Sequence, residues 1–436
     1  MQRYDSYKPS GVKWLGEIPS HWEMKRWRFL MSENTTKNTN CKERLQLQFR
    51  YGDIVRKSNQ SEESDVLDTI SKYTIVEPND IMINGLNLNY DFISQRVAQV
   101  QERGVITSAY ISLRPTEIAK SRYFTYFLKS MDAKKMFHGM GTGIRLTLSY
   151  NELKNQFIPC PSPDEQTAIA NYLDTATEKI DAAIAQQQKM IDLLNERKQI
   201  IINNAVTKGL NPNAKMKDSG VEWIGEIPED WEVNKFKNLY KTRTGITFTK
   251  AQLVEYGEPV ISYGQIHSKD NLCASVNPDL IRYIPSMLTE GNQEALAERG
   301  DFLFADTSED FEGCGNNIYI DTDSPIYAGY HTILAKCNNN QCGPYLAYLF
   351  ASTKWRGQIR SMVNGVKVYS ITQSIIKNAN VILPPLDEQK EIADYIKERV
   401  VVIDKAIKGY NKQISLLQER KQIVVNEVVT GKVRVG

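Results

Sequence analysis

The sequence has 436 residues, of which 41% are hydrophobic, and its 54 basic and 52 acidic side chains give a net charge of +2. This length allows two or three domains. No apolar run approaches the ~18 residues of a membrane span, and no apolar signal core follows the polar N-terminus. We therefore expect a cytoplasmic protein with no membrane partner, in which the six cysteines are reduced thiols.

The first block, residues 1–163, carries 23 basic and 17 acidic side chains, and this surplus of +6 suits a polyanionic partner. IVEPNDIMIN and GVITSAYISLRP are strand-like runs bounded by turn residues. YFTYFLKSMDAKKMF has Tyr, Phe and Leu on one face, as a packed helix does. These runs predict a mixed α/β domain.

Polar loops of this block supply side chains suited to DNA, because Asn and Arg have the shapes that bind adenine and guanine edges. The candidate contacts are Arg50, Arg56, Lys57, Asn84, Asn87, Asn89 and Arg96. The glycine-rich stretch GMGTGIRL adds Arg145, since backbone rich in glycine can approach a phosphate closely. The alternative is that this stretch is an ordinary surface loop.

Residues 164–210 predict one long helix. It starts at Asp-Glu-Gln, where Asp164 can cap the first turn, and Gly209 is a plausible stop. Its apolar residues follow the 4-3 spacing of a coiled-coil seam, interrupted at Gln187. The seam consists of Leu173, Thr177, Ile180, Ile184, Ile191, Leu194 and Ile201.

The second block, residues 211–386, has 16 basic and 20 acidic side chains, and this deficit of −4 counts against simple DNA binding. ERGDFLFADT and SPIYAGYHTILAK predict strands, and YLAYLFASTKWRGQI predicts a helix. Candidate DNA contacts are Lys241, Arg243, Thr244, Tyr263, Gln265, His267 and Tyr369, together with Lys367 of the NGVKVYS stretch as a phosphate contact.

Residues 387–436 predict a second long helix, which starts at Asp387 and stops near Gly431. Its seam has the phase of the first, with Tyr410 at the same interruption: Ile396, Val400, Ile403, Ile407, Ile414, Leu417 and Val424. We expect the two helices to pair with each other, antiparallel, because their seams match. Packing of each helix on its own globule, or dimerisation with another chain, is the alternative.

An internal repeat relates the two halves of the chain. SGVKWLGEIPSHWEM begins at Ser10 and SGVEWIGEIPEDWEV at Ser219, an offset of 209 residues. PSPDEQTAIANYL and PPLDEQKEIADYI are offset by 223 residues, and this offset holds through both helices. The two long helices are thus constant in length, whereas the blocks 1–163 and 211–386 have diverged in sequence. We divide the chain into 1–163, 164–210, 211–386 and 387–436, with an internal pseudo-twofold repeat.

Motifs of catalysis and metal binding are missing. The four histidines have no i, i+4 pair, and the cysteines near His331 match no zinc finger. No Walker A sequence, nucleophile elbow or kinase signature occurs. The Asn-Pro-Pro-aromatic motif of amino-methyltransferases is also absent, so we predict a chain that is not an enzyme and that holds no cofactor or metal.

The paired Gly-Glu-Ile-Pro-x-x-Trp segments (Gly16–Trp22 and Gly225–Trp231) and the paired Pro-x-x-Asp-Glu-Gln helix starts resemble the DNA-specificity subunits of type I restriction-modification systems. The resemblance covers essentially the whole chain. It implies two target recognition domains that each read half of a split, asymmetric site in double-stranded DNA. It also implies two long helices that set the distance between the half-sites.

The resemblance further implies partners that perform the chemistry. Two methyltransferase subunits would bring S-adenosylmethionine, and restriction endonuclease subunits would bring ATP and Mg²⁺. A coiled-coil scaffold that joins two protein-binding domains is the alternative function. It would explain the repeat and the acidic second block, but not why the blocks diverge while the helices keep their length.

Overall fold

The computed structural model describes residues 2–58, 64–90, 95–144, 146–338, 340–365 and 368–435. The chain forms two compact units, Met1–Gln188 with Asn411–Gly436, and Lys189–Tyr410. Each unit therefore contains one globule and parts of both long helices. Among the described residues, no helix is long and apolar enough to cross a lipid bilayer.

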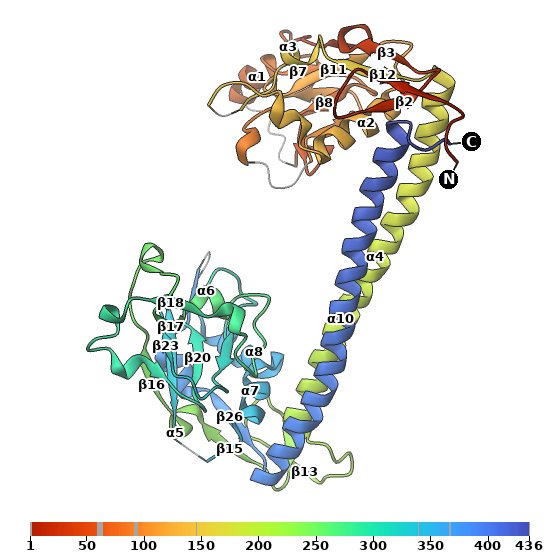
Figure 1. Cartoon of the computed structure of the whole chain (residues 1–436). Helices are drawn as coiled ribbons and strands as arrows, with labels where there is room; N and C mark the ends of the chain where they lie inside the picture. The colour runs from red at the N-terminus through yellow and green to blue at the C-terminus, as the bar shows by residue number, and fades with distance from the viewer. Residues whose placement is uncertain are drawn as a thin grey trace. The chain divides into compact units, whose positions relative to one another are not determined.

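The first globule, in which Figure 1 labels β8, β11 and α2, is built on a four-stranded antiparallel sheet in the order β4-β11-β8-β9. These strands are β4 (Met31–Glu33), β11 (Ile111–Pro115), β8 (Ile81–Ile83) and β9 (Val97–Gln99), and helix α2 (Ser121–Ala133) packs against β9. Strand pairs around the sheet are β1 (Tyr7–Pro9) with β2 (Glu17–Pro19), β3 (Glu23–Arg26) with β12 (Phe157–Cys160), β5 (Leu47–Arg50) with β6 (Asp53–Arg56), and β7 (Thr74–Val76) with β10 (Gly104–Ile106). Short helices are α1 (Ser64–Ser71) and α3 (Tyr150–Leu153).

The second globule repeats this sheet in the order β16-β24-β20-β22. Its strands are β16 (Tyr240–Thr244), β24 (Thr332–Cys337), β20 (Phe302–Ala305) and β22 (Asn317–Tyr319). It adds a second sheet of β18 (Arg282–Ile284), β17 (Glu258–Ile261), β23 (Ile326–Ala328) and β19 (Leu296–Ala297), in which β17 and β23 are parallel. Other pairs are β13 (Met216–Asp218) with β14 (Glu226–Pro228), β15 (Glu232–Lys235) with β26 (Asn380–Leu383), and β21 (Thr307–Ser308) with β25 (Tyr369–Ser370).

The helix predicted over residues 345–359 is two helices, α7 (Gly343–Ala351) and α8 (Thr353–Met362). Ser352 separates them with an extended backbone, and its hydroxyl oxygen accepts a hydrogen bond from Trp355 N at 3.1 Å. A serine that caps the next helix in this way ends the previous one, because the cap residue has non-helical dihedral angles. The remaining short helices are α5 (Phe236–Leu239), α6 (Tyr263–Ile266) and α9 (Gln373–Asn378).

The long helices are α4 (Pro163–Lys208) and α10 (Leu386–Val429), so both predictions of a long helix are confirmed. Each stops at a glycine with positive φ, 72° at Gly209 and 73° at Gly431. Asp164 does not cap α4, because the helix already begins at Pro163. Instead, the hydroxyl of Ser162 accepts a hydrogen bond from Glu165 N at 3.3 Å.

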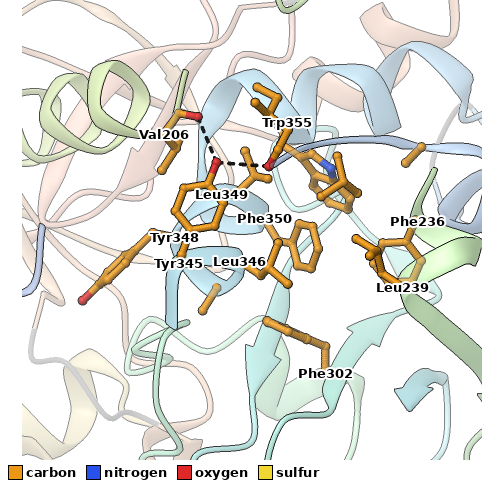
Figure 2. Close-up of a cluster of buried hydrophobic side chains, with 14 of the residues drawn as sticks. Val206, Phe236, Leu239, Phe302, Tyr345, Leu346, Tyr348, Leu349, Phe350 and Trp355 are labelled. Atoms are coloured by element: carbon orange, nitrogen blue, oxygen red, sulfur yellow. Dashed lines mark hydrogen bonds between the residues drawn. The ribbon is translucent and has the colours of Figure 1, made fainter. Parts of the chain in front are cut away.

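The end of α4 belongs to the core of the second globule. Ile202, Ala205 and Val206 are buried in one cluster with Trp355, Phe350 and Phe236. Figure 2 shows the Tyr345 hydroxyl, which donates to the carbonyl oxygens of Val206 (3.3 Å) and Ile382 (3.1 Å). This hydroxyl thus satisfies a carbonyl that the last turn of α4 would otherwise leave unpaired.

The end of α10 has the corresponding place in the first globule. Val424, Val425, Val428 and Val429 are buried in its core, and the Tyr123 hydroxyl donates to Val429 O at 3.0 Å. The two long helices therefore pair with each other and also pack on the globules, two arrangements that we expected as alternatives from the sequence. Each globule holds the start of the helix that follows it and the end of the other helix.

Antiparallel pairing is seen separately in each unit. In the first unit, Lys421 Nζ lies 2.7 Å from the Asp181 carboxylate, and in the second unit, Lys198 Nζ lies 2.8 Å from Asp404. Asp181 and Lys198 correspond to Asp404 and Lys421 through the repeat offset of 223 residues, so the two ion pairs are equivalent. This finding confirms the predicted α/β fold class with two globules and a pair of antiparallel helices.

The seam between the helices is buried or half-buried as predicted. Thr177 is only 7% exposed, because its hydroxyl lies 3.2 Å from the Tyr126 hydroxyl of the first globule. Its position in the seam therefore also serves the contact between α4 and α2.

Each repeated Trp binds the start of a long helix. Trp22 Nε1 donates to Glu165 Oε1 at 3.0 Å, and Trp231 Nε1 donates to Glu388 Oε2 at 2.9 Å. Both indoles are fully buried, and they also pack against the glycine at which the other helix ends. A Cβ atom on Gly209 would lie 3.1 Å from Trp231, and one on Gly431 would lie 3.0 Å from Trp22.

The glutamine of each Asp-Glu-Gln start is fully buried and has equivalent partners. The Gln166 side chain accepts from Lys120 N at 2.7 Å, and that of Gln389 accepts from Cys342 N at 3.0 Å. Lys120 and Cys342 precede α2 and α7, respectively. The repeated Trp, Glu, Gln and Gly residues, which we call the frame contacts, thus hold each globule to the helices in the same way.

Candidate nucleic-acid interface

The loop that follows β8 brings the candidate asparagines of the first globule together. Asn84 begins this loop, and Asn87 and Asn89 are exposed on it. Asn87 has a φ of 50°, a conformation that asparagine tolerates better than most residues do. The exposed amides can present donors and acceptors to base edges.

Arg96 has a supporting position in this loop. Its side chain is buried, and Nη1 donates to the carbonyl oxygens of Asn84 (2.9 Å) and Leu86 (2.7 Å). Nη2 donates to Asn87 O at 3.2 Å. Because the guanidinium binds three loop carbonyls, Arg96 fixes the shape of the loop in this structure and does not face solvent.

The glycine-rich segment of the first globule lies directly against the loop after β8, residues 84–89, which we call the asparagine loop. Leu88 N donates to Leu146 O at 3.1 Å, Leu148 N donates to Gly85 O at 2.9 Å, and the Asn89 amide donates to Ile144 O at 3.0 Å. Two segments that are more than fifty residues apart in sequence therefore form one surface. Arg145, the predicted phosphate contact, lies outside the described residues.

The β5–β6 hairpin carries the other candidates of this globule. Arg50 is exposed, and its guanidinium lies 5.6 Å from the ring centre of Tyr51. Arg56 forms an ion pair with Glu102 at 2.6 Å, and Lys57 is exposed. Tyr51 was not predicted, although it is 76% exposed and stands at the hairpin turn. Its position beside Gly52 in the sequence was the available signal.

The candidates of the second globule gather around the loop that follows β20. Thr307 and Ser308 of this loop pair with Ser370 and Tyr369 of the segment that corresponds to the glycine-rich one. In each globule, therefore, the loop after the equivalent strand, β8 or β20, contacts the equivalent later segment. The two globules share little sequence in these parts. Lys367 lies outside the described residues.

Two predicted residues of this globule are bound to neighbouring groups. His267 Nε2 lies 2.8 Å from Thr307 O and Nδ1 lies 3.0 Å from the Asn316 side-chain amide, so both ring nitrogens have hydrogen-bond partners. Gln265 accepts from Ser262 N at 3.1 Å and thereby caps α6. His267 thus supports the loop after β20, and Gln265 supports the start of α6.

The remaining predicted residues of this globule are at its surface. Lys241 is exposed, Arg243 forms an ion pair with Glu294 at 3.0 Å, and Thr244 accepts from the Gln373 amide at 3.0 Å. Tyr263 is half-buried, with its ring centre 5.5 Å from that of His331.

Sequence reasoning missed an exposed aromatic residue, Phe311, in the loop after β20. Its ring centre lies 5.6 Å from that of Tyr369, and the Arg360 guanidinium lies 6.0 Å from its centre. Arg360 also pairs with Glu312 at 2.8 Å. Aromatic rings and guanidinium groups are the usual partners of nucleobases, so this cluster belongs to the candidate surface.

The loop after β20 is acidic. It contains Asp306, Glu309, Asp310 and Glu312, and Asp306 lies 3.1 Å from His331 Nδ1. Carboxylates repel phosphates, but they accept hydrogen bonds from the amino groups of bases. The carboxylates of this loop can therefore accept hydrogen bonds from the amino groups of bases, but they would repel a phosphate.

The structure offers no metal site among its described residues, where no group of three or more His, Cys, Asp or Glu side chains could hold an ion. All six cysteines are free thiols. Burial raises the pKa of Cys160, Cys273, Cys314 and Cys342, so these thiols are less acidic than an ordinary cysteine.

Comparison with known proteins identifies the family. The model of the type I restriction modification DNA specificity domain matches residues 37–191 and 228–415. The chain is 26% identical over 371 residues to the type I restriction enzyme MjaVIII specificity subunit of Methanocaldococcus jannaschii, covering 84% of this chain and 81% of that protein. It is 23% identical over 331 residues to the EcoKI specificity subunit of Escherichia coli, covering 73% and 67%.

A chain in a solved type I restriction-modification assembly has the same fold, with a TM-score of 0.67 at 13% identity. The match covers 95% of this chain and 99% of that one. Two matched regions, one in each half of the chain, agree with the internal repeat and with the two similar sheets. This protein belongs to the family of type I restriction-modification DNA specificity subunits.

Proposed function

We propose that this chain is the DNA-recognition subunit of a type I restriction-modification complex and that each globule reads one half of a two-part site. It is not itself an enzyme. Methyltransferase and endonuclease subunits supply the S-adenosylmethionine and ATP chemistry, and the complex acts in the cytoplasm. The division into 1–163, 164–210, 211–386 and 387–436 is our proposal for its functional domains.

The observation that carries this proposal is the contrast between the frame contacts and the loops. Both globules bind the helices through equivalent Trp, Glu and Gln residues, yet the loops after β8 and β20 differ in sequence and charge. A protein that reads two different half-sites from one scaffold needs this combination.

In the first globule, the proposed DNA-contacting surface consists of the asparagine loop, the adjoining glycine-rich segment and the tip of the β5–β6 hairpin. Arg50 and Lys57 supply positive charge, and Asn87 and Asn89 supply amides. In the second globule, the surface consists of the loop after β20, β25 and the end of β16. We propose that phosphate contacts position the chain on DNA while the two loops provide specificity.

The outer faces of the helices support binding of two copies of one partner. Leu193 and Ile200 are 47% and 50% exposed on α4, and Leu416 and Ile423 are 54% and 47% exposed on α10. The repeat offset of 223 relates both pairs. Leucine and isoleucine spaced by seven residues form an apolar stripe that a further helix can cover. Two equal stripes suit two methyltransferase subunits.

The test of specificity is genome-wide mapping of methylated adenines in cells that express the chain with its methyltransferase. We expect one two-part site. Replacing residues 84–89 with the corresponding loop of a relative should change one half of the site and leave the other half intact. A change in both halves, or methylation without sequence preference, would contradict the proposal and favour the scaffold function.

The test of assembly is the mass of the purified complex. Leu193→Ser with Ile200→Ser should remove one methyltransferase copy, and Leu416→Ser with Ile423→Ser should remove the other. Exposed Tyr256→Ser, on the second globule, is a matched control that should retain both copies. Retention of two copies by both stripe variants would exclude these faces as docking sites.

A further inference from the structure

Ile144 is the most exposed of the large hydrophobic side chains that the structure describes, at 97%. Single exposed apolar residues are common on proteins and need no explanation by themselves. Ile144 differs because it stands at the tip of a closed turn on the proposed DNA-contacting surface, and its position is fixed by several hydrogen bonds.

The turn is closed by the pair Thr142 and Thr147, whose backbone groups exchange hydrogen bonds of 3.0 and 2.9 Å. Gly143 has a φ of 77°, and Leu146 N donates to Gly143 O at 3.1 Å. The Asn89 amide holds Ile144 O at 3.0 Å. These four hydrogen bonds hold the described residues of the turn, 142–144 and 146–147, in place.

The two apolar side chains of the tip point in different directions. Leu146 packs against the core of the first globule, and its neighbour Leu88 lies in the same core. Ile144 remains in solvent, although burial of an isoleucine side chain is favourable by roughly 1.5–3 kcal/mol. The turn thus holds one apolar side chain outward, next to the exposed residue Asn89, whose amide donates to Ile144 O.

The surroundings of Ile144 favour DNA as the occupant. Among residues 84–89, 142–144 and 146–148, Ile144 is the only large hydrophobic side chain that is exposed, so these residues form no continuous apolar patch of the kind that a protein partner requires. The major groove admits a two-stranded ribbon, so it has room for this turn, which a single bridge closes. There an A·T pair places the thymine methyl group beside hydrogen-bonding groups of adenine, which matches an isoleucine next to the Asn89 amide.

We propose that Ile144 is a specificity-determining residue that contacts the 5-methyl group of a thymine in the half-site read by the first globule. This inference rests on the proposed function. The sequence repeats the pattern of glycine, β-branched apolar residue and cation at 365–367, which suits a similar role in the other half-site.

The test uses the complex with its methyltransferase subunits and duplexes that carry the mapped site. Deoxyuridine replaces each thymine of the first half-site in turn, which removes only the methyl group. For one thymine, we expect binding by the unaltered complex to weaken about fourfold, as the loss of one buried methyl group predicts. Ile144→Ala should bind the thymine and deoxyuridine duplexes equally, and Ile144→Val should be intermediate.

Tyr256→Ala is the control, because it truncates an 83% exposed side chain of the other globule and should leave the thymine preference unchanged. Ile144→Ala should not alter thermal unfolding, since the side chain is almost wholly in solvent. The proposal fails if Ile144→Ala keeps the full preference for thymine, if no thymine of the half-site is sensitive, or if the variant loses methyltransferase subunits instead. Failure of the unaltered complex to prefer its site over a scrambled duplex would contradict the proposed function itself.

Discussion

The frame contacts are equivalent in the two halves of this molecule, whereas the recognition loops differ between them. Trp22 and Trp231 are equally buried and bind Glu165 and Glu388 at nearly equal distances. The loop after β8 reads Asn-Gly-Leu-Asn-Leu-Asn, whereas the loop after β20 reads Asp-Thr-Ser-Glu-Asp-Phe-Glu. Buried contacts allow few replacements because cavities and unpaired polar groups are costly. Exposed loops have no such constraint, so specificity can change without loss of the fold.

The two globules also differ in net charge. The block of the first globule has a surplus of positive charge, and that of the second has a deficit. We infer that the first globule contributes more of the attraction to phosphates, while the second relies more on base edges and on partner subunits. The following four predictions test the frame and the loops, from the largest expected effect to the smallest.

Removal of a frame tryptophan should be the most damaging change. Trp22→Ala or Trp231→Ala should each destabilise its own unit by about 3–5 kcal/mol, because a fully buried indole leaves a large cavity. Urea unfolding with hydrogen exchange as the readout can follow the two units separately. Trp22→Phe, which keeps much of the packing but loses the bond to Glu165, should cost less. Destabilisation of only one unit by the two alanine variants would show that the frame contacts are not equivalent.

Removal of a loop amide should alter recognition and leave stability unchanged. Asn87→Gly retains the left-handed backbone and removes the side chain, so discrimination at one base pair should fall by roughly 1–3 kcal/mol. Glu309→Gln is the counterpart in the second globule, and it should affect only the other half-site. Competition binding with single-base variants of the site measures both effects. A uniform loss of affinity for all sequences would indicate phosphate contacts instead.

The repeated aspartates Asp80 and Asp301 provide a pH test. Arg114 binds Asp80 through two nitrogens at 2.9 and 2.7 Å, whereas Lys336, at the equivalent position, lies 3.7 Å from Asp301. Burial raises the pKa of Asp301 above its ordinary value of 3.8. The folded state then binds a proton more tightly than the unfolded chain, so the second unit loses stability as pH rises from 3.8 through the raised pKa.

Lys336→Arg should supply the paired hydrogen bonds, lower the pKa of Asp301 and stabilise the second unit at neutral pH by about 1 kcal/mol. The gain should shrink as the pH falls through the pKa of Asp301 and vanish only well below 3.8, where the carboxyl is protonated in both the folded and the unfolded state. Arg114→Lys is the reciprocal variant and should weaken the first unit. Urea unfolding across this pH range is the measurement, and a gain that does not depend on pH would mean that arginine acts through packing.

The ion pairs between the helices should have the smallest effect. Asp404→Lys places two cations together in the second unit and should cost about 0.5–1 kcal/mol, and adding Lys198→Asp should recover most of it. The same exchange at Asp181 and Lys421 should cost less, because Asp181 is 54% exposed and Asp404 is 36% exposed. Equal or larger costs in the first unit would show that solvent exposure does not govern these pairs.

The sequence by itself determined the repeat, both long helices, their glycine stops and the phase of their seams. These features depend on local chemistry and on periodicity, which a single helix displays without its neighbours. Two strands of each repeated sheet, β8 with β11 and β20 with β24, were also predictable, because they are short apolar runs between turn residues. The start of α4 was predicted one residue too late, with Asp164 as the cap, whereas the helix begins at Pro163 and the Ser162 hydroxyl accepts from Glu165 N.

Only the tertiary structure decided which side of each loop a residue faces. Arg96 resembled a DNA contact in sequence but binds the carbonyls of its own loop, and Ile144 points outward while Leu146 packs inward. Nor could sequence alone show that α10 ends in the core of the first globule, where Tyr123 binds Val429. Such contacts join residues hundreds of positions apart, and their energy depends on burial and partners that exist only after the chain has folded.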